Sequence, residues 1–181
     1  MTDHHEPRGT ITGIFVSPAA GAPMRSLARV EAIAGQGLAG DRYGSGEGFM
    51  SGRRGGGLEL TLVEEEALDS LSAENGVTIT AADSRRNLAT RGVELAALVG
   101  QRFRIGDVIC LGVSLCEPCV RIEQLIGKPF VRPMVHRAGL RADILSSGSV
   151  RVGDAVVPLG TGEADRPPTP ARATAPDAAT G

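Results

Sequence analysis

The stretch RFRIGDVICLGVSL, residues 102–115, is the clearest indication of the fold class. It contains two apolar segments separated by Gly106-Asp107, a dipeptide typical of a tight turn between two strands. The same pattern recurs in RADILSSGSVRVGDAVVPL, residues 141–159, where turns are predicted at Ser147-Gly148 and Gly153-Asp154. Several short strands joined by tight turns indicate a β-rich fold.

The chain before residue 102 adds further strands and short helices. Segments rich in β-branched and other apolar residues predict strands at TITGIFV (10–16), SLARVEAIAG (26–35) and LELTLV (58–63), with an extended VTIT (77–80). Apolar spacing predicts helices at 64–76, 94–100 and 120–127, and loops are predicted at the glycine-rich 35–57 and the polar 83–92. The pattern favours a β-rich α+β fold: a closed or nearly closed β-barrel of short mixed strands with a few short inserted helices.

Length and composition set the domain organisation. The chain has 181 residues, which suits one domain, predicted at 10–159. Residues 1–9 are polar and predicted to be flexible, and 160–181 are predicted to be a disordered Pro/Ala-rich tail because that segment offers almost no apolar surface to bury. The 19 basic residues are offset by 21 acidic ones, which argues against a nucleic-acid partner. No membrane span or signal peptide is indicated, so we expect a cytoplasmic protein.

The pentapeptide LCEPC, residues 115–119, is the strongest candidate for chemistry, and it has three interpretations. A structural zinc site needs four ligands, and beyond this motif only Cys110 and His136 remain without suitable spacing. A redox pair resembles a thioredoxin motif, but that motif follows an early strand and opens a long helix. Here it falls two thirds along the chain and precedes a short helix.

The third interpretation is a single working thiol. Pro118 suits the first turn of a helix, which would place Cys119 within that turn, close to free backbone N–H groups. The positive end of the helix dipole and the nearby Arg121 would then favour its thiolate. Cys116 would lie outside the helix. The sequence therefore favours Cys119 as the nucleophile or metal ligand.

Two further positions are candidates for an anion site. Asp41-Arg42 lies within the glycine-rich segment, where an acid and an arginine could either form a surface ion pair or order the loop against an anionic ligand. His136 lies among Arg132, Arg137 and Arg141, and several neighbouring guanidinium groups indicate a negative partner.

Several segments, in the same order along the chain, resemble the MOSC domain family, named for the C-terminal part of molybdenum cofactor sulfurases. They are GLAGDRYG (37–44), LELTLVEEEAL (58–68), SRRNLATRGVELAALVGQRFRIGDVICLG (84–112), LCEPC (115–119) and MVHRAGLRA (134–142). The resemblance implies a β-rich barrel and makes Cys119 the family's characteristic cysteine. It also implies a cofactor site formed by Asp41, Arg42, Arg85, Arg86, Asn87, Arg91, His136 and Arg137.

The resemblance is to stand-alone members of the family. It implies that Cys119 ligates the molybdenum of a pterin cofactor and that the protein reduces N-hydroxylated compounds with an external electron donor. The alternative is a carrier that holds sulfur as a persulfide on Cys119, or the cofactor itself, for transfer; a third is a redox pair of Cys116 and Cys119. At family level the resemblance also includes pyridoxal phosphate binding. Expected partners are a small-molecule substrate, the cofactor, and an electron-donor or sulfur-donor protein; the oligomeric state is not indicated.

Overall fold

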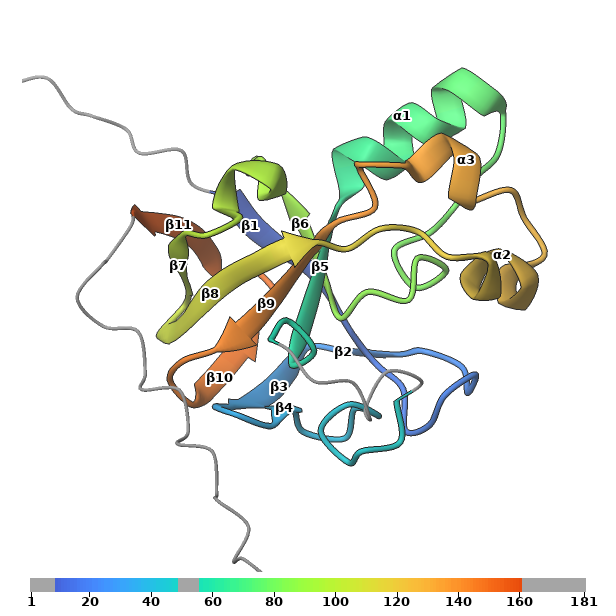
Figure 1. The fold of residues 1–181 in the computed structure, drawn as a ribbon. Helices are drawn as coiled ribbons and strands as arrows, with labels where there is room; N and C mark the ends of the chain where they lie inside the picture. The colour runs from blue at the N-terminus through green and yellow to red at the C-terminus, as the bar shows by residue number, and fades with distance from the viewer. Residues whose placement is uncertain (1–8, 49–55, 161–181) are drawn as a thin grey trace, which may run out of the picture.

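The computed structural model describes residues 9–48 and 56–160 (Figure 1). Seven strands form a closed barrel in the order β11-β7-β8-β9-β5-β6-β1, and β1 pairs with β11 to complete the ring. These strands are β1 (Gly9–Val16), β5 (Leu60–Glu64), β6 (Leu88–Arg91), β7 (Arg102–Ile105), β8 (Val108–Leu115), β9 (Leu140–Ile144) and β11 (Ala155–Gly160). Only the β5–β6 pair of this ring is parallel. The predicted closed, mixed barrel is confirmed.

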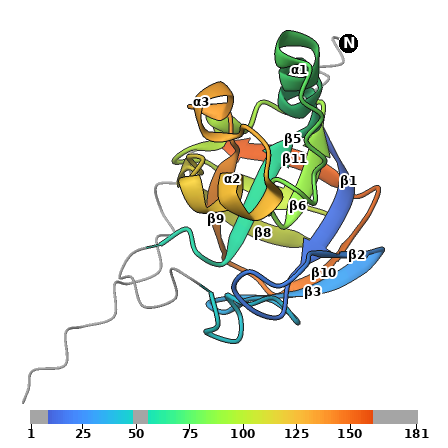
Figure 2. The same cartoon turned by 90° about the vertical axis from the view of Figure 1, so that its right-hand side faces the viewer.

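The remaining strands extend and cover the barrel. β2 (Arg25–Leu27) pairs with β1, and a separate sheet consists of β10 (Gly148–Arg151), β3 (Arg29–Ile33) and β4 (Gly37–Leu38). Buried Val30, Leu38 and Val150 of this small sheet belong to the same apolar cluster as the barrel interior. The small sheet therefore covers one side of the barrel core, as both views of the ribbon show (Figures 1 and 2).

The barrel interior is filled by fully buried apolar side chains, among them Ile11, Leu62, Phe103 and Leu140. Each contributes about 1.5–3 kcal/mol of transfer free energy on folding. In β5 the residues Leu60–Val63 are all buried, whereas β3 of the small sheet alternates exposed and buried residues along RVEAI, as a strand with one covered face does.

Short helices occupy the connections. α1 (Glu65–Asn75) links the parallel strands β5 and β6, as a parallel pair requires a crossover, and it ends at Gly76 in the left-handed conformation. A 3-10 helix, η1 (Leu95–Leu98), follows β6, while α2 (Val120–Ile126) and α3 (Val131–Met134) lie between β8 and β9. A second apolar cluster, which includes Leu71 of α1 and Met134 of α3, joins the helices to the barrel. No helix within the described residues is long and apolar enough to cross a membrane.

The structure differs from the predictions in local detail. Residues 26–35 form two strands rather than one, residues 77–80 form none, and β6 lies within the predicted polar loop 83–92. At the predicted domain boundaries, Gly9 begins β1 and Gly160 ends β11. The rest of the predicted N-terminal extension and tail lies outside the described residues.

Candidate functional site

A pocket of about 340 Å³ lies where β8 ends and α2 begins. Segments far apart in the sequence meet there, and Figure 2 shows α2 in front of the barrel strands. The lining residues are Ala20, Gly21, Arg42, Tyr43, Arg85, Arg86, Glu117, Pro118, Cys119, Arg121, Ile122, Leu125 and Arg141. Five of these are arginines and one is acidic, so the pocket is suited to an anionic ligand.

Asp41 and Arg42 form a buried ion pair at the base of this site. Arg42 Nη1 lies 3.2 Å from Asp41 Oδ1, with side-chain exposures of 8% and 1%. The Asp41 carboxylate also accepts hydrogen bonds from the backbone N–H groups of Ser17 (3.0 Å) and Tyr43 (3.3 Å). The Arg42 guanidinium stacks over the Tyr43 ring, 5.0 Å from its centroid. The pair is therefore a buried element of the loop rather than a surface ion pair.

Arg85 presents its guanidinium from a backbone in the left-handed region, with φ of 59°. Its Nη1 donates to the carbonyl oxygen of Ala22 at 2.9 Å, and its Nη2 lies 3.5 Å from Ser17 Oγ. Burial and the neighbouring charge of Arg42 lower the pKa of Arg85 from its usual value. A half-buried cation whose hydrogen-bond partners are uncharged is the kind of group that an anion would stabilise.

Arg86, the next residue, uses its guanidinium differently. It is buried, and its Nε donates to the carbonyl oxygen of Ala138 at 2.9 Å. Its Nη2 donates to the carbonyl oxygens of Cys116 (3.0 Å) and Glu117 (3.4 Å). Arg86 thus connects the cysteine loop to the segment that precedes β9.

Cys119 is the exposed thiol of the chain, whereas Cys110 and Cys116 are buried and all three are free. The helix was predicted to include Cys119 in its first turn, but α2 begins at Val120 and Cys119 is the extended residue before it. Pro118, predicted at the first helical position, lies one residue further out. The reason is that Cys119 keeps extended φ and ψ of −133° and 152°, and its carbonyl accepts the first helical hydrogen bonds. Burial raises the pKa of Cys110 to about 12, so that thiol is inert.

Glu117 links the pocket to His136. Its carboxylate accepts a hydrogen bond from the His136 backbone N–H at 2.9 Å, which lowers the pKa of Glu117, and also lies 2.9 Å from His136 Nδ1. His136 has a left-handed backbone with φ of 63°, and its side chain is 79% exposed. It therefore approaches the pocket through Glu117 rather than by lining it.

Besides Asp41 and His136, three more predicted site residues do not line the pocket. Asn87, which directly precedes β6, is buried; its side-chain oxygen accepts from the Thr61 N–H and hydroxyl (3.2 and 2.9 Å) of β5, and its amide N–H donates to the Phe15 carbonyl oxygen (3.3 Å) of β1. Arg91 pairs with Glu65 and Asp69 of α1. Arg137 pairs with Glu74, also of α1. Their geometry favours structural roles.

Tyr43 and Glu117 line the pocket, and neither was predicted as a site residue. Tyr43 directly follows Asp41-Arg42, and Glu117 lies between the two cysteines of LCEPC. The available signal was that Tyr43 directly follows Arg42 and that Glu117 lies two residues before Cys119.

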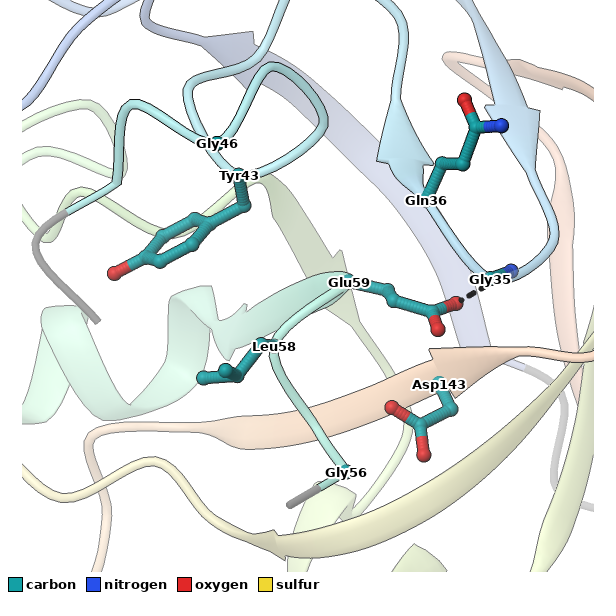
Figure 3. Close-up of a pocket in the computed structure, with 8 residues that line it drawn as sticks. All are labelled: Gly35, Gln36, Tyr43, Gly46, Gly56, Leu58, Glu59 and Asp143. Carbon is teal, nitrogen blue, oxygen red and sulfur yellow. Dashed lines mark hydrogen bonds between the residues drawn. The ribbon is translucent and has the colours of Figure 1, made fainter. Parts of the chain in front are cut away.

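A second pocket, of about 270 Å³, is also lined by Tyr43 (Figure 3). Its two acids are Glu59, just before β5, and Asp143, within β9, and Figure 3 shows the Glu59 carboxylate directed toward Gly35. Glu59 Oε2 accepts hydrogen bonds from the backbone N–H groups of Gly35 (3.2 Å) and Ile144 (2.8 Å). These carboxylates hold the loops around them. Within the described residues, no cluster of three or more His, Cys, Asp or Glu side chains could hold a metal ion.

The barrel agrees with the comparison with known families. Residues 55–157 match the MOSC domain, more than half of the chain, so the protein belongs to the MOSC domain family.

Solved structures share the fold. The YuaD protein from Bacillus subtilis superposes with a TM-score of 0.68 at 17% identity, covering 82% of this chain and 94% of YuaD. YiiM from Geobacillus stearothermophilus superposes with a TM-score of 0.60 at 13% identity, covering 83% of this chain and 75% of that YiiM chain. YiiM from Escherichia coli superposes with a TM-score of 0.59 at 15% identity, covering 83% of this chain and 70% of that YiiM chain. No curated protein matches the chain.

Proposed function

We propose that the arginine-lined pocket binds a molybdenum cofactor, with Cys119 as the protein ligand to the metal, and that the protein reduces N-hydroxylated compounds. The observation that carries the proposal is an exposed thiol at the edge of a pocket with five guanidinium groups and one carboxylate. MOSC domains as a family are associated with this cofactor.

The residues fit the chemical groups of such a cofactor. A phosphate is matched by planar, always charged guanidinium groups, and a thiolate is a suitable soft ligand for a transition metal. Because the described residues offer no cluster of other ligands, Cys119 would supply a single protein ligand. Pyridoxal phosphate fits less well, since Lys128, the chain's one lysine, contacts Asp83 and the Thr78 carbonyl oxygen instead of lining the pocket.

The protein's own residues would bind and orient. Hydrogen bonds to the segment at 17–22 orient the Arg85 guanidinium, so this group is already in position before an anion binds. Arg42, paired with the buried Asp41, lies beside Arg85 and donates to the Arg85 carbonyl oxygen at 3.3 Å. Ile122 and Leu125 give the pocket an apolar side that can exclude water from a bound substrate.

The proposed reaction breaks the N–O bond of a hydroxylamine-type group: R–NHOH, two electrons and two protons give R–NH₂ and water. The bound cofactor would supply the two-electron chemistry. The electrons come from a separate donor protein.

One observation favours a second function. Cys119 is exposed, so a sulfur-donor protein could reach its thiol, and the domain would then carry sulfur as a persulfide or hold the cofactor for transfer. The redox-pair alternative is less favoured, because Cys116 is only 1% exposed.

Metal and pterin analysis of protein purified from a cofactor-making host tests these proposals. Stoichiometric molybdenum and pterin, lost in Cys119→Ser, is the result expected for cofactor binding. Cyanide-labile sulfur without metal would favour the carrier function. If the protein contains neither molybdenum nor labile sulfur, both proposals are refuted.

A further inference from the structure

We infer that Arg86 is a positioning residue for the Cys119 loop and not a ligand-binding arginine, although it lies beside Arg85. This rests on the proposed role of Cys119 as the working thiol, and it assigns the two adjacent arginines separate tasks. Arg85 would contact the anion, and Arg86 would fix the loop that carries the thiol.

The contacts of Arg86 carry the inference. Its guanidinium is buried and its hydrogen bonds within the described residues are to backbone carbonyl oxygens of Cys116, Glu117 and Ala138. Hydrogen bonds with a charged donor are stronger than neutral ones, and a planar fork holds two directions at once. One side chain thus joins the cysteine loop to the strand entry at β9.

Other contacts restrain the same two segments. The Cys116 backbone N–H donates to the Gly139 carbonyl oxygen at 2.7 Å, and Glu117 holds the His136 backbone N–H. Gly139 itself lies against the Leu62 carbonyl oxygen, leaving no room for a side chain. The loop is therefore fastened at its Cys116 end, while Cys119 at the other end stays exposed.

The consequence is that the position of Cys119 depends on Arg86 through the backbone. A lysine keeps the charge at this position but cannot hold three carbonyl oxygens in a fixed fork. Arg86→Lys should therefore loosen the loop while leaving the charge of the pocket unchanged.

The three cysteines provide site-specific reporters. In the cofactor-free protein, alkylation by iodoacetamide followed by mass spectrometry measures each thiol separately. Cys119 reports the working thiol, Cys116 reports local opening of the loop, and Cys110 in the barrel core reports global unfolding. Titration with inorganic phosphate measures anion binding in the same samples.

For Arg86→Lys we expect Cys116 labelling to rise about tenfold, because charge-assisted hydrogen bonds to the loop are lost, with Cys110 still protected. Phosphate affinity should stay within about twofold of wild type, since the pocket charge is kept. The matched control, Arg85→Gln, should weaken phosphate binding and leave Cys116 protected.

Opposite results would overturn the inference. If Arg86→Lys leaves Cys116 protected and weakens phosphate binding, Arg86 is a ligand-binding residue. If Cys116 and Cys110 become labelled together, Arg86 stabilises the whole fold. If that variant does not fold, the labelling rates of the wild-type protein decide. Equal rates at Cys116 and Cys110 would mean that the cysteine loop opens only with the whole fold, and the inference would be refuted. Unchanged phosphate affinity in Arg85→Gln would instead refute the anion site and leave the role of Arg86 intact.

Discussion

Replacing Asp41 by alanine should destabilise the protein strongly, because it would leave the Arg42 guanidinium buried without its counter-ion. Arg42 is 7% exposed, and Asp41 Oδ1 lies 3.2 Å from its Nη1. Removing one partner of a buried ion pair costs about 3–5 kcal/mol. The backbone N–H groups of Ser17 and Tyr43 would lose their acceptor as well. For a chain of this length the melting temperature should fall by roughly 6–20 °C.

Urea unfolding and thermal melting measure this loss, and the chain offers a matched control. Arg29 and Glu31 form an ion pair at 2.7 Å, but both side chains are about half exposed. Glu31→Ala should therefore cost less than about 1 kcal/mol. If Asp41→Ala costs as little as Glu31→Ala, the buried pair does not hold the loop. Arg42→Ala in the Asp41→Ala background should recover part of the loss, since the unpaired charge is then removed.

Three further outcomes are expected. Cys119→Ser should abolish metal or sulfur loading while Cys116→Ser retains most of it, and equal losses with a reversible disulfide between the two would contradict this. Burial raises the pKa of Glu59, so its ionised form opposes folding at neutral pH, and protonation relieves this cost as the pH falls through that raised value. The stability of wild type relative to Glu59→Gln, measured by urea unfolding, should therefore rise from pH 7 toward pH 4; a constant difference would refute it. Gly139→Ala should fail to fold, because its Cβ would collide with the Leu62 carbonyl oxygen and φ is +114°; a normal melting curve would show that this contact yields.

The sequence was sufficient to predict the barrel because its turns are local. Gly106-Asp107 lies between β7 and β8, and these two strands pair as expected. Gly153-Asp154 does precede β11, but the strands on either side of it pair elsewhere, β10 with β3 and β11 with β7 and β1. Strand β6 was missed because Leu88 and Thr90 lie between arginines, and only pairing with β5 and β1 makes the segment a buried strand. Long-range pairing of this kind leaves no periodic pattern in a short polar segment.

The candidate site was also only partly predictable from the sequence. Arg42, Arg85, Arg86 and Cys119 do line one pocket, and Asp41 is paired with Arg42, although these segments are far apart in the sequence. Arginine identity alone could not separate these from Arg91 or Arg137, because each arginine's task depends on which carboxylates fold next to it.

Arg91 and Arg137 both face acids of α1, which neutralise them on the surface. Arg85 instead faces carbonyl and hydroxyl oxygens. The partners of each arginine are set by the tertiary structure, and residue spacing in the sequence does not reveal them.

The pairing of β1 with β11 joins the first and last strands of the barrel, and this has a kinetic consequence. Contacts between residues so distant in sequence form late in folding, because the long intervening segment must lose conformational entropy before the pairing stabilises the chain. During synthesis the N-terminal strand must wait for the final strand to leave the ribosome, with its edge unpaired meanwhile. A nascent chain, or one from which β11 has been removed, would thus expose the edges of β1 and β7, and unpaired edges of this kind are what chaperones protect from aggregation.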